Sequence, residues 1–409
     1  MHVIPAHRHH RNAHQRGVSL VELMVALAIG LFLVLGLVQI FSATRLAFAA
    51  NEGLARVQEN SRFAVEFLRE DLRMAGHMGC LNELGYRGRA HNHVLTSPTP
   101  TNGQWPYRLD YPVQVYEFTG TGPGATVTLG TTRSTPAGNS WSPALPTQIA
   151  GTALNLSDVV VVRYLSADFV PIAGINYATG SETLSVAAAD AAYVTNGGIY
   201  GVTDCKNISL FQIRSGGAVS QGGLNIRGWT AAENAYGQFN MLHQYRFAAY
   251  FVANNGAGEP GLYRRELQAD GNLGNAQEVV PGVESLQVVL GVNAQLRGRT
   301  EGDTPSNYVT GANVQAGNGI TWATPSACVP IPPAATCTAA QVTEQAQAQR
   351  WASVVNFRVG MLIRGPQGAG IPQPENNPSV ADTRVELPDD GRMRQTYETQ
   401  ITIRNRIRG

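Results

Sequence analysis

The chain has 409 residues, which is long enough to bury a large core in one big domain or in two. Charged residues make up only 14% of it, against roughly 25% in typical soluble cytosolic domains, and its many glycines favour a β-rich exported protein. The formal net charge is +1 and no dense stripe of Arg and aromatic residues occurs, which argues against direct binding of nucleic acid.

The N-terminus begins with a basic stretch that an apolar run follows. Residues 1–16 contain Arg and His but no acid, so the positive-inside rule predicts that they remain in the cytoplasm. No residue from Leu23 to Thr44 is charged, and a helix of about 22 residues can cross a hydrocarbon core of about 30 Å. An ordinary signal-peptide core is shorter and ends at a small-residue cleavage site. We therefore predict a transmembrane segment at about residues 20–44.

Glu22 is the one charged residue at the start of this run. A carboxylate at the bilayer centre costs on the order of 2.5 to 3.5 kcal/mol, so it needs either a partner or a shallow position. Cleavage between Gly17 and Val18 would place the new α-amino group of Val18 one helical turn before Glu22. In an uncleaved signal anchor, Glu22 would instead lie among the lipid headgroups. These residues alone leave both interpretations open.

The segment from Gly17 to Leu23 resembles the class III signal sequence of type IV prepilins and type II secretion pseudopilins. In that family a Gly precedes the cut, the first mature residue is usually Phe and becomes N-methylated, and the fifth mature residue is Glu. Gly17, Val18 and Glu22 occupy these positions, with Val18 in place of Phe. The resemblance implies cleavage by a prepilin peptidase, N-methylation of Val18 and a role for Glu22 in assembly.

Helical periodicity continues beyond the apolar run, and no proline occurs from Val18 to Ser97. The pattern predicts one helix from about Leu20 to Met74, roughly 80 Å long at 1.5 Å per residue. Gly76 and Gly79 are suited to ending it. Apolar residues on one face of its second half require a protein surface to pack on: Leu54, Val57, Ala64, Leu68, Leu72 and Ala75.

The rest of the chain reads as strands between loops rich in Gly, Pro and Asn, several of them alternating apolar with polar residues. Two stretches with little periodicity, at about 90–150 and 294–350, are predicted to be loop insertions. The predicted strands are Val113–Phe118, Val127–Leu129, Asp158–Leu165, Ile208–Arg214, Tyr245–Val252, Gly261–Leu267, Glu284–Val292, Val354–Arg364 and Arg394–Arg404.

Four cysteines occur, and none has a spacing suited to zinc. An even number in an exported chain suggests two disulfides, although four cysteines allow three pairings and free buried thiols remain an alternative. We favour Cys328 with Cys337, because prolines bend the short segment between them. That choice leaves Cys80 to pair with Cys205.

The sequence predicts no enzyme, no cofactor and no metal site. It contains neither a phosphate-binding P-loop nor a GxSxG nucleophile motif. His91 and His93 could offer two ligands from one strand face, but no third ligand accompanies them.

Several motifs in order resemble the PilW family of minor pilins. They are Arg62-Phe63-Ala64, Leu72–Gly76 and Gly79-Cys80 at the helix end, with looser likeness in the strands that follow. The resemblance implies an α+β, pilin-like fold. In it, a long N-terminal helix, with a transmembrane first half, packs on a large antiparallel β-rich head. The domains expected are a leader at 1–17, a helix at 18–75 and a head at 76–409.

The same resemblance implies a minor pilin in a tip complex that primes pilus polymerisation and so supports twitching motility, adhesion or DNA uptake. Its expected partners are the prepilin peptidase, other minor pilins, the major pilin, the inner-membrane assembly platform and a tip adhesin. The head would lie in the periplasm and later at the pilus tip. Two alternatives remain: a minor pseudopilin of a type II secretion system, and a signal-anchored extracytoplasmic binding protein or hydrolase that never polymerises.

Overall fold

The computed structural model describes residues 17–80, 90–95, 102–204, 207–229, 240–294, 304–325, 327–328, 336–367 and 377–404. Residues 1–16 of the predicted leader at 1–17, and Cys205, lie outside these residues. The chain divides into two compact units, Met1–Glu52 and Gly53–Gly409. We call the second unit the head, and each unit is described by itself.

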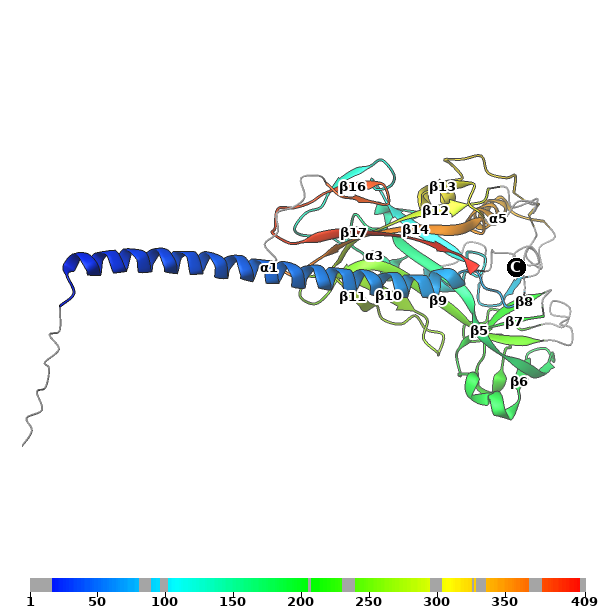
Figure 1. Cartoon of the computed structure of the whole chain (residues 1–409). Helices are drawn as coiled ribbons and strands as arrows, with labels where there is room; N and C mark the ends of the chain where they lie inside the picture. Colours follow the sequence, from blue (N-terminus) through cyan, green and yellow to red (C-terminus); the bar gives the residue numbers. More distant parts are fainter. Residues whose placement is uncertain are drawn as a thin grey trace, which may run out of the picture. The chain divides into compact units, whose positions relative to one another are not determined.

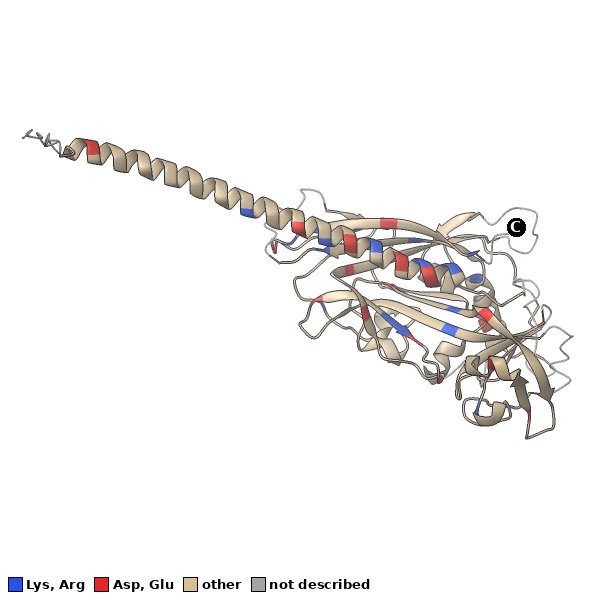
Figure 2. Ribbon diagram, turned by 60° about the horizontal axis from the view of Figure 1, so that its bottom comes forward, with Lys and Arg blue, Asp and Glu red and all other residues tan. Residues whose placement is uncertain are grey.

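A single helix, α1 (Leu20–Met74), runs from the first unit into the head, as the sequence predicted. Figure 2 shows a long stretch of α1 without charge between one acidic residue near its start and the charged second half. The apolar side chains of this stretch are exposed, Phe32 to 75%. Such a surface needs lipid or protein around it, because exposed apolar area of this extent is unfavourable in water.

Within the head, α1 buries the predicted face. Val57, Ala64, Leu68 and Leu72 are buried, while Leu54 is half-buried. Most of the charged side chains of this part of the helix lie on the exposed face. The helix ends where the sequence predicted, because Gly76 adopts the left-handed conformation (φ 70°) that follows many helix ends, and its N–H donates to the Arg163 carbonyl oxygen at 2.9 Å.

The strands of the described part of the head form three sheets, and each predicted strand segment overlaps a strand (Figure 1). The largest has ten strands, with a path β1-β8-β7-β9-β5-β2-β4 and with β6, β10 and β11 beside it. A four-stranded sheet has the order β13-β12-β14-β17, and a three-stranded one β15-β16-β3.

The bounds of the strands are β1 Ala90–Asn92, β2 Val113–Phe118, β3 Thr126–Thr128, β4 Trp141–Ser142, β5 Val159–Asn176, β6 Thr183–Val186, β7 Ile199–Thr203, β8 Ile208–Gln212, β9 Met241–Asn254, β10 Pro260–Glu266, β11 Gln277–Pro281, β12 Val283–Val292, β13 Asn307–Val309, β14 Val354–Arg364, β15 Ser379–Val380, β16 Thr383–Glu386 and β17 Arg394–Thr402. The other helices within the described residues are α3 Thr147–Ala150, α4 Gly311–Ala316 and α5 Ala339–Trp351, with short 3-10 helices at Asn102–Tyr107, Gly138–Ser140, Ala188–Tyr193 and Ser215–Gly217.

The main core lies between α1 and the two larger sheets. Alternate residues of the long strands face it, such as Val160 and Val162 of β5 and Tyr250 of β9. Leu286 of β12 and Phe357 of β14 close it from the four-stranded sheet. The second half of α1 is therefore a structural part of the head.

The predicted loop insertion at 90–150 needs correction. Besides the predicted strand β2, which belongs to the ten-stranded sheet, it holds η1 (Asn102–Tyr107) and α3, and residues of this stretch cover the face of the sheet opposite the main core. Trp105, Trp141 and Ile149 pack there against strand residues such as Val161 and Phe247. Sequence periodicity missed this role, because a covering segment with few regular elements shows no repeating apolar pattern.

The stretch at 294–350 is likewise more than a surface loop in its described part. It contains β13, α4 and α5, and its Val309 and Val314 enter the main core together with Trp351. The start of α5 has a capping box, in which the side chains of Thr338 and Gln341 exchange hydrogen bonds with each other's backbone N–H. That signal was present in the sequence as a Thr and a Gln three residues apart, but the helix has little apolar periodicity.

Candidate processing and assembly site

Gly17, Val18 and Glu22 come together at the start of α1, with Val18 exposed to 73%. A capping box forms here. The Ser19 N–H donates to Oε2 of Glu22 at 2.9 Å, and the Glu22 N–H donates to Oγ of Ser19 at 3.2 Å. Glu22 therefore satisfies an otherwise unpaired donor of the first helical turn and lies at the positive end of the helix dipole.

Sequence reasoning had missed the part that Ser19 plays. The signal was present, because a Ser followed by a Glu three residues later directly before an apolar run is a capping-box pattern. In the uncut chain the capping box gives Glu22 a partner of its own. The predicted pairing of Glu22 with a free amine on Val18 belongs to the cleaved chain and stays a prediction.

The apolar part of α1 has the length and composition of a membrane span. Its side chains are exposed throughout, unlike those of a core helix in a soluble protein, which are mostly buried. The helix can therefore serve as an anchor in lipid, and the same surface can pack against other helices.

Asp71 fastens α1 to the head. It is only 2% exposed, on the helix face that packs on the ten-stranded sheet. The hydroxyls of Tyr164 (β5) and Tyr250 (β9) donate to its carboxylate at 2.5 and 2.6 Å, and Nε of Arg264 (β10) donates to it at 3.0 Å. Three neighbouring strands thus hold one acidic side chain of the helix, and a buried charge is retained only with such partners.

These contacts alter the proton affinity of the groups around Asp71. Burial, and next the negative charge of Asp71, raises the pKa of both tyrosines, Tyr164 and Tyr250. Burial alone would lower the pKa of Arg264, but Tyr250 and Asp71 outweigh it and raise the pKa. The cluster therefore keeps protonated tyrosines and a charged Arg264 next to Asp71.

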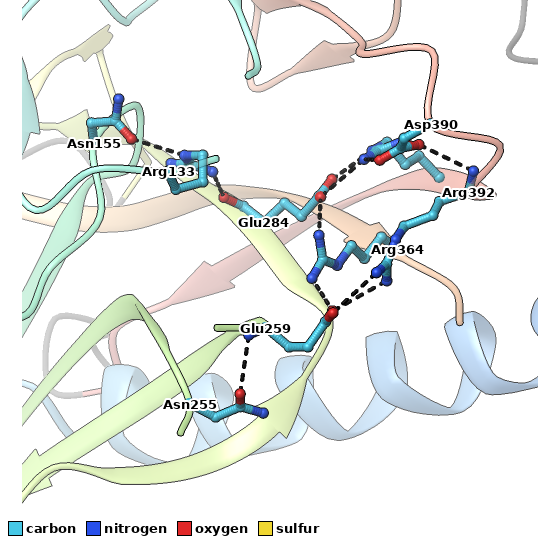
Figure 3. Close-up of polar contacts among 9 residues, drawn as sticks. Arg133, Asn155, Asn255, Glu259, Glu284, Arg364, Asp390 and Arg392 are labelled. Atoms are coloured by element: carbon cyan, nitrogen blue, oxygen red, sulfur yellow. Dashed lines mark hydrogen bonds and ion pairs between the residues drawn. The ribbon is translucent and has the colours of Figure 1, made fainter. Parts of the chain in front are cut away.

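A second charged cluster lies beside the first turns of α1 in the head (Figure 3). Glu284 (β12) accepts from Arg364 (β14) at 3.1 Å and from Arg394 (β17) at 2.6 Å. Arg394 also pairs with Asp390 at 2.7 Å. Three adjacent strands of the four-stranded sheet are thus linked through charged side chains.

The cluster extends to the turn between β9 and β10. Glu259 in that turn pairs with Arg392 at 3.0 Å and also contacts Arg364 (Figure 3). Hydrogen bonds from Arg394 lower the pKa of Asp390, and burial lowers the pKa of Arg133, beside Glu284, to about 10. Asn60 of α1 reaches the same region, where its amide donates to the Pro281 carbonyl oxygen at 3.0 Å. Ion pairs between strands, and one hydrogen bond from α1, therefore hold the strands and the helix together in this part of the head.

The structure contains the disulfide between Cys328 and Cys337, with a Cα–Cα distance of 6.3 Å. Cys80, just beyond α1, is also disulfide-bonded. Its predicted partner, Cys205, lies outside the described residues.

Neither histidine named as a possible ligand forms part of a metal centre in the described part of the chain. No three His, Cys, Asp or Glu side chains come together there to hold a metal ion. His93 is fully buried, and burial, with Arg227 next, lowers its pKa to about 3. The expectation that the chain has no metal site and no enzymatic activity stays a prediction.

Comparison with known families adds two matches. The family described as Type IV Pilus-assembly protein W matches residues 249–405, which run from the end of β9 through β17. The Prokaryotic N-terminal methylation motif matches residues 12–38, which include Gly17, Val18 and Glu22. No curated protein and no solved structure matches the chain. The chain therefore combines a prepilin-type motif at its N-terminus with a C-terminal part of the head that is similar to the PilW family of type IV pilus assembly proteins.

Proposed function

We propose that this chain is a minor pilin that helps to start pilus assembly as part of a complex at the pilus tip. The main support for this proposal is that one helix, α1, has an exposed apolar first part and a second part that packs in the core of a large head. Movement of the apolar part out of lipid would be transmitted directly to the head.

The proposed sequence of events begins in the inner membrane. The apolar part of α1 anchors the precursor, with its leader in the cytoplasm and its head in the periplasm, and the prepilin peptidase cuts between Gly17 and Val18. Leaving the lipid removes favourable apolar contacts, and packing against helices of other pilins replaces them. Glu22, freed from its cap or still within it, would then set the axial position of the subunit through charge pairing.

A tip position suits the size of the head. The head spans Gly53–Gly409 and carries the β13–α5 segment in addition to its sheets. A shaft subunit must fit identical neighbours on every side, whereas a tip subunit meets that constraint on one side only. The proposed partners are other minor pilins, the major pilin and the assembly platform, and the proposed role is structural, without catalysis.

Two measurements in cells test the proposal. Deletion of the gene should sharply reduce the number of surface pili, and the unaltered chain should restore it. Gold-labelled antibodies against the head should mark one end of isolated pili. Label at regular intervals along the filament would contradict the tip position, and a normal number of pili without the chain, together with a loss of protein secretion, would point to a secretion system.

A further inference from the structure

A cavity of about 340 Å³ lies in the head among the residues directly after β12, the end of α4, the segment that follows α4, and α5. Neither the fold nor the assembly function accounts for it. Its polar and aromatic lining comprises Asn293, Trp322, Thr324, Gln349, Arg350 and Ser353. These side chains offer amides, hydroxyls, one indole and one guanidinium, and the lining contains no acidic residue.

Arg350 is held in a defined position at this cavity. Its Nε donates to the Val314 carbonyl oxygen at 2.8 Å and its Nη2 to the Gln315 carbonyl oxygen at 2.7 Å, at the C-terminal end of α4. Gly317 makes room for it, since a Cβ there would lie 3.2 Å from Cζ of Arg350. Among the residues described, no carboxylate lies within ion-pair distance of this guanidinium. An arginine has five N–H donors, so some remain for a ligand.

Trp322 forms a second fixed wall. The side chain is half-buried against the main core, and its Nε1 donates to the Asn318 carbonyl oxygen at 3.2 Å. An indole held in this way presents a rigid apolar face with little loss of conformational freedom on binding.

The disulfide joins two chain segments that contribute residues to the lining of the cavity. Cys328 follows the lining segment that contains Trp322 and Thr324, and Cys337 directly precedes the capping residue of α5. The bridge therefore limits the relative movement of the segment after α4 and the start of α5, which reduces the ordering that a ligand would have to impose.

We propose that this cavity binds a pyranose sugar that carries a carboxylate, of the uronic acid class. The carboxylate would pair with Arg350, whose planar fork matches a carboxylate in two parallel hydrogen bonds. One apolar face of the ring would pack on Trp322, and the neighbouring amides and hydroxyls would bind the sugar hydroxyls. A volume near the lower end of the range for small-ligand sites, roughly 300 to 1,000 Å³, suits one sugar residue. This binding goes beyond pilus assembly and does not depend on it.

Titration calorimetry of the full chain in detergent micelles tests the proposal, with galacturonate as the probe and galactose as its neutral counterpart. We expect saturable binding of galacturonate and binding of galactose weaker by about ten-fold or more, since a charge-assisted pair is lost. Trp322→Ala and Arg350→Gln should each weaken galacturonate binding by about ten-fold. Val342→Ala, on an exposed part of α5 outside the cavity, should leave it unchanged.

Three results would overturn the proposal: no saturable binding of galacturonate, equal affinity for the two sugars, or an unchanged affinity in the Trp322→Ala variant. Because Arg350 also caps α4, its replacement could unfold this region. If the Arg350→Gln variant unfolds, the comparison of galacturonate with galactose on the unaltered chain still tests whether the carboxylate of the sugar contributes to binding. The calorimetry result does not depend on the proposed assembly function. It stands whether or not deletion of the gene reduces the number of pili.

Discussion

Glu22 and Asp71 are both acidic residues of α1, but their surroundings differ. Glu22 lies at the exposed helix start and, among the described residues, has the capping box with Ser19 as its partner. Asp71 is buried and held by three side chains of the head. The first carboxylate is free to exchange its partner during assembly, whereas the second cannot leave without exposing a buried cluster.

For Glu22→Ala we expect normal insertion into the membrane and loss of incorporation into pili. The variant removes a charge whose insertion costs energy, but it also removes the group that would pair with a neighbouring amine. Membrane fractionation and immunoblotting of sheared pili measure the two steps. Normal incorporation of the variant would show that Glu22 has no role in assembly.

Ser19→Ala separates capping from charge pairing and serves as the matched control. It removes the cap, at a cost of about 1 kcal/mol to the helix start, but leaves the carboxylate in place. The variant should therefore still enter pili.

Asp71→Asn should destabilise the head by about 3 kcal/mol or more, because removal of one partner leaves a buried charge poorly compensated. Among the described residues, Arg264 would keep Glu266, at 2.9 Å, as its acidic partner. The measurement is urea unfolding of the full chain in detergent, followed by near-ultraviolet circular dichroism. Glu70→Gln is the control, since this neighbour is exposed and surface substitutions change stability by about 0.5 kcal/mol or less. Equal unfolding midpoints for the two variants would contradict the anchoring role of Asp71.

Between elements, Asp158 joins the two larger sheets. Its carboxylate accepts from the backbone N–H of Phe118 at the end of β2, at 3.0 Å, and from that of Val288 in β12, at 2.9 Å. Burial, with the nearby charge of Glu117 next, raises its pKa to about 8. The carboxyl of Asp158 therefore keeps its proton up to a higher pH in the folded head than in the unfolded chain.

The sign of the resulting pH dependence follows from proton binding. Between about pH 4 and pH 8 the folded state binds more protons at this site than the unfolded state, so the contribution of Asp158 to stability decreases as pH rises. Asp158→Asn has no proton to bind. The difference in unfolding free energy between the parent and this variant should therefore be larger at pH 5 than at pH 8 in urea titrations. A difference that grows with pH would show that the carboxylate is charged in the fold.

The disulfide between Cys328 and Cys337 restrains the β13–α5 segment, whose Val309 and Val314 reach the main core. In the chain-entropy model, closing a loop of this size stabilises the fold by about 2.5 to 3 kcal/mol. Replacing both cysteines by serine should lower the free energy of unfolding by that amount or less. It should also speed proteolysis between β13 and α5, detected by mass spectrometry of the fragments. Unchanged proteolysis would mean that the core contacts alone restrain this segment.

At the scale of the whole molecule, processing should remove the first part of the chain. We expect the intact mass of the membrane-extracted protein to correspond to a chain that starts at Val18, in cells that have a working prepilin peptidase. Gly17→Leu should retain the leader, because a bulky residue cannot occupy the position before the cut. Gly30→Ala is the control, since a Cβ at Gly30 meets no atom within 4 Å. A leader still attached to the unaltered chain would refute the pilin interpretation.

Much of the fold could be predicted from the sequence, but with uneven success. The helix ends at Met74 as predicted, and every predicted strand segment overlaps a strand. Strand β7 (Ile199–Thr203) was missed, because glycine at its centre weakens the local strand signal. That glycine leaves room for a distant side chain, since a Cβ at Gly201 would lie 2.6 Å from Cδ2 of Leu165 unless that side chain moved. A close approach of this kind depends on a distant strand and leaves no local pattern.

For the candidate sites too, some features follow from the local sequence and others depend on contacts between distant parts of the chain. By itself, the sequence predicted a processing site and determined the membrane-length helix and the alternating strands, because periodicity, capping and charge placement act over a few residues. Only the tertiary structure decided that Asp71 anchors the helix, that Asp158 joins two sheets and that Arg350 faces a cavity. The energy of a buried charge depends on which partners surround it. For these three residues most of the partners come from distant parts of the chain.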